Sequence, residues 1–302
     1  MSVPDYQSIM LPLLQLLSDG QTYTTRDLIE KMSDVFKLND SERKELLPSG
    51  QQHVFDNRVG WARTYLKKAG LVESDKIGTQ KITTRGLDVL KKGPKQINVD
   101  FLEQFPEFIA FKSQKSLTKP GIKTQTTEQT IETPEEIIEE KFLSINNDLI
   151  DDLLEKIKSC SPDFFEKLVV DLIVAMGYGG SRQDAGKAVG RSGDGGIDGI
   201  IKEDRLGLDA IYLQAKRWEN AIPIKEIRDF AGALLSKKAR KGIFISTSQF
   251  PASAYEYVQS IEPRIILIDG KLLANMMIEY GIGIETQKNY KISKINNDYF
   301  EE

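Results

Sequence analysis

A polar stretch in the middle of the chain limits what the protein can fold into. Residues 112–141, KSQKSLTKPGIKTQTTEQTIETPEEIIEEK, are rich in Thr, Gln, Lys and Glu, and Pro120 and Pro134 interrupt them. A segment of this composition buries too little apolar surface to offset the conformational entropy lost on ordering. We therefore predict a flexible polar linker over residues 94–144, which divides the rest of the chain into two separate cores.

Both flanking segments are long enough to form a domain. The chain has 302 residues, and globular domains average roughly 150. We place one domain at residues 1–93 and the other at residues 145–302. Neither can be a disulfide framework or a zinc module, because Cys160 is the sole cysteine and His53 the sole histidine. We expect His53 to lie at a helix start without a catalytic role.

Hydropathy gives no sign of a membrane protein. No apolar run approaches the ~20 residues that cross a bilayer. The first ten residues, MSVPDYQSIM, lack the basic and then apolar order of a signal peptide. We therefore expect a cytoplasmic protein with no membrane partner.

The distribution of charge is uneven. The whole chain carries 41 basic and 45 acidic side chains, for a net charge of −4. Residues 58–92 nevertheless hold nine basic and three acidic residues, a local net charge of +6. A local basic patch matters more to a polyanion than the sum over the chain, so nucleic acid stays a candidate partner.

The first domain is predicted to be a winged helix. Apolar periodicity and capping residues predict helices over about 4–17, 24–36 and 51–69, with a short helix after Asn39. Two short strands at 71–74 and 81–83 would form a hairpin, and a last helix would cover 84–90.

Helix 51–69 is the candidate nucleic-acid reader of this domain. Phe55, Val59, Ala62 and Leu66 share its apolar face. The residues opposite or beside that face suit contacts to bases and phosphates; they are Asn57, Arg58, Trp61, Arg63, Thr64, Lys67 and Lys68. Lys76 and Lys81 on the hairpin would add contacts to the DNA backbone. The alternative is an ordinary solvated helix face with Trp61 as a partly buried core residue.

The second domain alternates helices and strands. Ser161 can cap a helix that begins at Pro162, after a first helix at about 145–158. Strands are predicted at 196–201, 210–216, 242–247 and 265–268, with helices at 224–236, 251–260 and 270–280 between and after them. This alternation indicates an α/β domain.

A glycine-rich run leads into a candidate catalytic site. Residues 177–199 hold 9 of the 23 glycines and deliver Asp198 to a short apolar strand. In the next strand, AIYLQAKRW, alternation places Tyr212, Gln214 and Lys216 on one face. A carboxylate and an amide oxygen are suitable ligands for Mg²⁺, and a lysine can orient water beside a phosphate. A glycine loop, a surface aspartate and a strand-end lysine would give the same pattern.

Several segments resemble the Mrr family of modification-dependent (type IV) restriction endonucleases. GGSRQDAGKAVGRSGDGGIDGII, LQAKRW and GIFISTSQF resemble its catalytic domain, and SPDFFEKLVVDLIVAMGYGG resembles the opening helix of that domain. SGQQHVFDNRVGWARTYLKKAGLVE resembles its winged-helix domain, and the terminal DYFE also fits. The resemblance covers nearly all of the chain except the linker.

The resemblance implies a fold and an activity. The fold is α/β: a restriction-endonuclease-like catalytic domain, related to PD-(D/E)xK nucleases, with an N-terminal, mostly helical winged-helix domain. The activity is metal-dependent hydrolysis of methylated double-stranded DNA, in the restriction of foreign DNA, with Mg²⁺ or Mn²⁺ as cofactor. One site per chain implies a homodimer or higher homo-oligomer, since two strands must be cut.

Individual site residues also follow from the resemblance. Asp198 corresponds to the metal-ligating carboxylate, Lys216 to the motif lysine, and Gln214 to a ligand position that is usually acidic. Glu166 lies on the opening helix, where a structural salt bridge is the alternative to a site role. Asp194 is either a loop residue or a further ligand. Gln214 leaves one negative charge fewer at the metal, so the number of metal ions stays open.

Two other functions compete with this hypothesis. One is a DNA-binding regulator whose nuclease-like domain does not cleave, and the other is a structure-selective DNA nuclease. The intact set of Asp198, Gln214 and Lys216 argues against the first, and the appended winged helix favours duplex recognition over the second.

Overall fold

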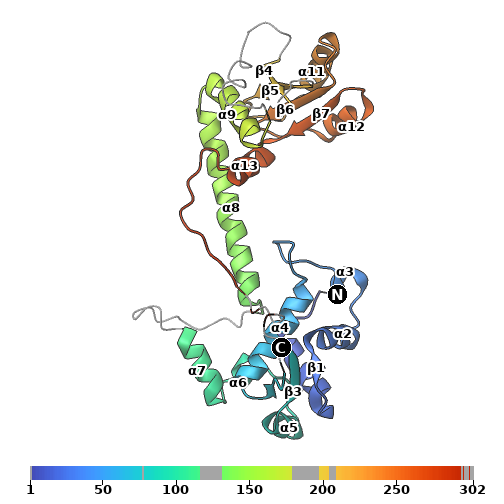
Figure 1. Ribbon diagram of the computed structural model, residues 1–302, viewed down its shortest axis with the longest axis vertical. Coiled ribbons are helices and arrows are strands. Elements are labelled where there is room, and N and C mark those ends of the chain that lie inside the picture. The colour runs from blue at the N-terminus through green and yellow to red at the C-terminus, as the bar shows by residue number, and fades with distance from the viewer. Residues whose placement is uncertain are drawn as a thin grey trace. The chain divides into compact units, whose positions relative to one another are not determined.

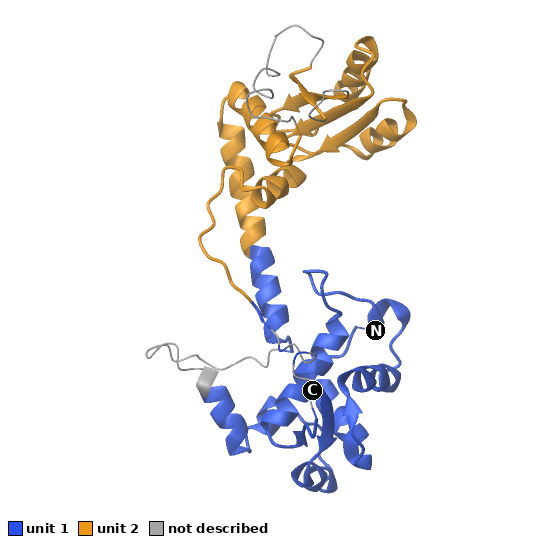
Figure 2. Cartoon of the chain, viewed as in Figure 1, with its two compact units in different colours: residues 1–144, 292–302 blue, residues 145–291 orange. Residues whose placement is uncertain are grey.

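The computed structural model describes residues 2–76, 78–115, 131–178, 197–203, 209–293, 295 and 299. The chain divides into two compact units (Figure 2). Unit 1 comprises residues 1–144 and 292–302, and unit 2 comprises residues 145–291. Most of the predicted glycine-rich run, including Asp194, lies outside the described residues.

Unit 1 begins with helices (Figure 1). They are α1 (Tyr6–Leu16), the 3₁₀ turn Leu17–Asp19, α2 (Thr25–Val35), α3 (Asp40–Arg43) and α4 (Val54–Lys68). Capping residues set the helix starts: Thr24 and Asp27 form a capping box on α2, and Asn39 and Glu42 form one on α3. Phe55, Val59, Ala62 and Leu66 on α4 are fully buried, as their spacing predicts.

A small antiparallel sheet accompanies these helices in unit 1. Its strands β1 (Tyr23–Thr24), β2 (Val72–Glu73) and β3 (Thr79–Ile82) lie in the order β1-β3-β2. The helix α5 (Thr84–Lys91) follows the β2–β3 hairpin. The predicted hairpin and helix positions therefore agree with the structure to within about three residues.

The prediction of a linker over 94–144 is wrong for much of the described part of that segment. Residues after α5 form α6 (Val99–Leu102) and α7 (Pro106–Lys115), and Ile97, Leu102 and Phe108 are buried in the core of unit 1. A long helix, α8 (Pro134–Ser159), starts eleven residues before the predicted start at 145. The segment is polar in its average composition, but it contains apolar residues that pack in the core of unit 1. It also contains a capping box, formed by Thr133 and Glu136, that starts α8.

Unit 2 is built on a four-stranded sheet in the order β4-β5-β6-β7. Strand β4 (Gly199–Lys202) is antiparallel to β5 (Ala210–Lys216). Strands β5, β6 (Lys241–Ser246) and β7 (Arg264–Ile268) are parallel to one another. The boundary between the units falls within α8, whose Ile150, Leu153 and Ile157 belong to the core of unit 2.

Helices cover both faces of this sheet (Figure 1). One face buries Ile211, Leu213 and Ile245 together with α8, α9 (Pro162–Ala175) and α13 (Gly270–Glu279). The other buries Phe244 with α11 (Ile224–Ser236) and α12 (Ala252–Ser260). Gly242 is required on that second face, because a Cβ there would lie 2.8 Å from the ring of Phe230. The result is the three-layer α/β architecture that the alternation of elements predicts.

Among the described residues, no helix combines the length and the apolar composition needed to cross a membrane.

Candidate active site

The candidate site lies where β4 begins beside the end of β5. Gly199 pairs with Leu213 in the antiparallel ladder, and the backbone N–H of Asp198 donates to the carbonyl of Leu213 at 2.8 Å. The Oδ2 atom of Asp198 then accepts the backbone N–H of Ala215, also at 2.8 Å. The carboxylate therefore replaces a strand carbonyl at the point where the ladder ends, and this fixes it beside Gln214 and Lys216.

Asp198 is held in an environment that disfavours its charge. Burial raises the pKa of the Asp198 carboxyl, while the Ala215 N–H and the Lys216 ammonium lower it, and the net pKa shift is upward. A buried carboxyl group with a raised pKa is typical of functional sites. In a purely structural role, a basic partner would be expected to neutralise the charge of the carboxylate.

Glu166 on α9 belongs to the same electrostatic group. Burial raises the pKa of the Glu166 carboxyl, and the negative charges of Asp198 and then Asp163 raise it further, against an opposing effect of Lys216. Coulombic coupling of this kind requires short separations, so Glu166, Asp198 and Lys216 lie close together. Among the ion pairs of the described residues Glu166 takes part in none, which supports the site role over the structural salt bridge.

Gln214 supplies an oxygen without a partner. Its side chain is 4% exposed, and within the described residues its Oε1 atom is buried and accepts no hydrogen bond. A buried amide oxygen left in this state costs about 1–3 kcal/mol, unless a cation or a water molecule binds it. The donor set of two carboxylates and one amide oxygen fits a hard divalent cation, although no group of three or more acidic, His or Cys side chains is assembled for a metal in the described parts of the chain.

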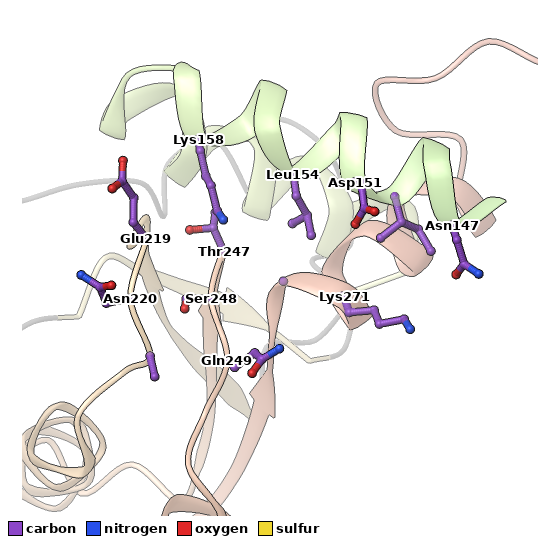
Figure 3. Close-up of a pocket in the computed structure, with 13 residues that line it drawn as sticks. Asn147, Asp151, Leu154, Lys158, Glu219, Asn220, Thr247, Ser248, Gln249 and Lys271 are labelled. Atoms are coloured by element: carbon purple, nitrogen blue, oxygen red, sulfur yellow. The ribbon is translucent and has the colours of Figure 1, made fainter. Parts of the chain in front are cut away.

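A separate hollow of about 550 Å³ opens at the carboxyl ends of β5 and β6 (Figure 3). Lys158 and Asp151 on α8 line it, together with Glu219 and with Lys271 at the start of α13. It borders β5, because the backbone N–H of Thr247 donates to the carbonyl of Lys216 at 3.2 Å. None of the four candidate site residues lines it, and its mixed charges favour no single class of ligand.

The predicted DNA-binding face of α4 is partly covered, which corrects the sequence interpretation. Thr133 Oγ1 donates to the Oδ1 atom of Asn57 at 2.6 Å, and the Asn57 amide donates to Glu135, so Asn57 is only 2% exposed. The Trp61 indole N–H also donates to Glu135, at 2.8 Å. These side chains face protein, because the start of α8 lies on them.

Arg58 also contacts the start of α8. Its guanidinium forms an ion pair with Glu136 at 2.7 Å and donates to the carbonyls of Val3, at 2.6 Å, and Pro4, at 3.3 Å. The two charged side chains are 17% and 11% exposed. The helical period of α4 does not predict this docking, although the TPEE sequence at 133–136 carries the signal of a capping box with proline at the first helical position.

The other predicted DNA-binding residues differ in how accessible they are. Lys68 lies over the ring of Phe111 at 5.2 Å, and half-buried Arg63 donates to Thr25 Oγ1 at 2.7 Å. Burial lowers the pKa of the Arg63 guanidinium. Lys67 is exposed and donates to Ser74 on the hairpin at 2.9 Å.

Three further predictions concern Thr64, the hairpin lysines and His53. Thr64 is half-buried and donates to the Gly60 carbonyl at 2.9 Å. Lys76 is exposed, and Lys81 lies 3.9 Å from Asp75. His53 is the N-cap residue of α4, so the prediction that it lies at a helix start is confirmed.

Comparison with known proteins identifies relatives along the whole chain. The family model described as restriction endonuclease (Mrr catalytic) matches residues 157–277, and the Mrr N-terminal domain matches residues 6–92. The Escherichia coli (strain K12) protein described as type IV methyl-directed restriction enzyme EcoKMrr is 36% identical over 312 residues, covering 100% of each chain.

Two solved restriction endonucleases are also similar, at lower identity. The MspJI restriction endonuclease in complex with a 27-mer oligonucleotide is 17% identical with a TM-score of 0.31, covering 52% of this chain and 35% of its own. The DNA modification-dependent restriction endonuclease AspBHI is 16% identical with a TM-score of 0.34, covering 70% of this chain and 56% of its own.

Proposed function

Because the chain belongs to the Mrr family of restriction endonucleases, we propose that it hydrolyses phosphodiester bonds of methylated double-stranded DNA in the restriction of foreign DNA. The observation that carries the proposal is the Asp198 carboxylate at the end of the ladder, whose Oδ2 atom accepts the Ala215 N–H at 2.8 Å and which therefore lies beside Gln214 and Lys216. The Oε1 atom of Gln214, which accepts no hydrogen bond within the described parts of the chain, adds an amide oxygen to this group.

Each residue has a distinct role in this proposal. Asp198 and Gln214 hold a divalent cation, for which we propose Mg²⁺, with Mn²⁺ as a substitute, and Glu166 adds a second carboxylate to the same site. When bound, the cation polarises the scissile phosphate and makes a coordinated water more acidic. The Lys216 ammonium orients the attacking water and offsets the negative charge that develops on the phosphate.

The choice of methylated DNA rests on the relative rather than on a visible pocket. The E. coli relative is described as methyl-directed. A methyl group on a base projects into the major groove, where apolar contact can recognise it. One site per chain cuts one strand, so we further propose that a homodimer or higher homo-oligomer makes the double-strand break.

Cleavage of matched plasmids tests this function. Methylated and unmethylated forms of one plasmid are incubated with the full chain and Mg²⁺, with EDTA and with an Asp198→Asn variant as controls. We expect cleavage of the methylated plasmid only, and loss of cleavage in both controls. Equal cleavage of both plasmids would refute the methyl specificity, and cleavage in excess EDTA would refute the metal-dependent mechanism.

A further inference from the structure

The α4 helix has two polar sides with different surroundings. The closed side consists of Asn57, Arg58 and Trp61, and the acidic start of α8 (Thr133–Glu139) lies on it. The open side consists of Gly60, Arg63, Thr64 and Lys67, and it faces the start of α2 and the β2–β3 hairpin. At 100° per residue the centres of the two sides are separated by about 120° around the helix.

The closed side is unsuited to DNA for two reasons. Residues 131–140, IETPEEIIEE, hold five glutamates and no basic residue, so the covering segment repels phosphate. Removing that segment would leave the Arg58 guanidinium without its nearly buried partner and the Asn57 amide without its acceptor. Ser49 ties the same segment down further, because its backbone N–H and its hydroxyl both donate to Glu139 at 2.8 Å.

The open side has the properties that a duplex requires. Apart from Gly60, its two neighbours and the adjacent α4 backbone, no atom of the described residues lies within 4 Å of the position that a Cβ at Gly60 would occupy, so another backbone can approach α4 there. Lys67 is exposed at the end of α4 nearest the hairpin, where Lys76 is also exposed. Arg26 follows Thr25, the partner of Arg63, and its side chain is 88% exposed. Basic side chains therefore lie on both sides of the α4 surface that contains Gly60 and Thr64.

We propose that unit 1 contacts duplex DNA through the open side of α4, with Lys67, Lys76 and Arg26 meeting phosphates, while the acidic start of α8 keeps the closed side covered. This inference rests on the proposed function, since it takes DNA as the substrate. It reassigns recognition away from Asn57, Arg58 and Trp61, which become structural residues that dock α8 on α4.

Binding of the full chain to a methylated duplex of about 30 base pairs, in EDTA so that no cleavage occurs, tests the proposal. Gly60→Glu places a negative charge on the open side at a position with space for it, and we expect binding to weaken at least about tenfold. Gln15→Glu, which adds the same charge at an exposed position of α1, is the matched control and should bind like the parental chain.

Lysine and glutamate variants separate the two sides. Lys67→Ala should weaken binding and reduce the slope of log affinity against log salt by about one, whereas Lys91→Ala, at an exposed position of α5, should change neither. Combined Glu135→Gln and Glu139→Gln should leave affinity within about twofold of the parental value, because DNA does not compete for the closed side. Thermal unfolding of every variant verifies that unit 1 stays folded.

The outcomes distinguish this inference from the proposed function. If the parental chain binds the duplex but Gly60→Glu and Lys67→Ala bind equally well, the open side is not the contact surface. A tenfold gain in affinity on neutralising Glu135 and Glu139 would also overturn the inference. It would mean that DNA competes with the acidic start of α8 for the closed side of α4. Failure of the parental chain to bind or cut any duplex would instead refute the proposed function.

Discussion

Removal of Glu136 should destabilise unit 1 by an amount that its contacts allow us to work out. The Glu136 carboxylate pairs with Arg58 and also accepts the backbone N–H of Thr133 at 2.7 Å. Breaking a buried ion pair from one side costs about 3–5 kcal/mol, but Arg58 keeps two backbone carbonyls as acceptors, so we use about 2 kcal/mol. Loss of the capping hydrogen bond adds about 1 kcal/mol.

The resulting loss of about 3 kcal/mol is measurable in the intact chain. For a unit of this size, 1 kcal/mol corresponds to a shift in Tm of about 3 °C, so Glu136→Ala should lower the Tm of unit 1 by about 9 °C. The chain has two tryptophans, Trp61 in unit 1 and Trp218 in unit 2. In a Trp218→Phe background, Trp61 fluorescence therefore reports the unfolding of unit 1 alone.

Two further variants make this prediction specific. Glu136→Gln keeps the size of the side chain but removes the charge, and it should show a smaller but clear fall in Tm. Glu140→Gln lies four residues along the same helix and removes only an exposed contact with Lys141, so Tm should not change. If Glu136→Ala unfolds at the parental temperature, the start of α8 is not docked on α4 and the reasoning about the closed side fails.

Four other predictions concern the candidate active site. Lys216→Ala should abolish cleavage while leaving duplex affinity in EDTA within about threefold of the parental value, and a large loss of affinity would argue for a binding role. Gln214→Glu should retain metal-dependent cleavage because it restores a carboxylate, so inactivity at every metal concentration would contradict its assignment as a ligand. Burial raises the pKa of the Asp198 and Glu166 carboxyl groups, so the cleavage rate should begin to fall at a higher pH than it would with carboxyl groups of ordinary pKa. Added Mg²⁺ should shift this loss of activity to lower pH. A pH profile that does not respond to Mg²⁺ would count against these residues as ligands. The free energy of unfolding of unit 2 should instead increase as the pH falls through the range in which Asp198 and Glu166 take up protons. The reason is that the folded chain binds these protons more tightly than the unfolded chain does. Urea unfolding at several pH values measures this change.

The sequence by itself determined most of the secondary structure and the positions of the candidate site residues on β4 and β5. Apolar residues on α4 recur with the helical period, and Thr24, Asn39 and Ser161 carry capping side chains, so these local elements follow from neighbours a few residues apart. Alternation along β5 set Gln214 and Lys216 on one face, and the structure agrees because residues on the other face, such as Leu213, lie in the opposite core.

Tertiary structure alone decided which polar residues face solvent. Asn57 and Trp61 are predicted opposite the apolar stripe of α4 and Arg58 beside them, so the helical period predicts exposure. Yet Glu136, which lies 78 residues from Arg58 in sequence, covers this side. Likewise, Asp198 gains its place in the site by accepting the Ala215 N–H, 17 residues away, and Glu166 comes from a different helix. Periodicity carries information only over a few residues, whereas burial and charge coupling depend on segments that the fold brings together.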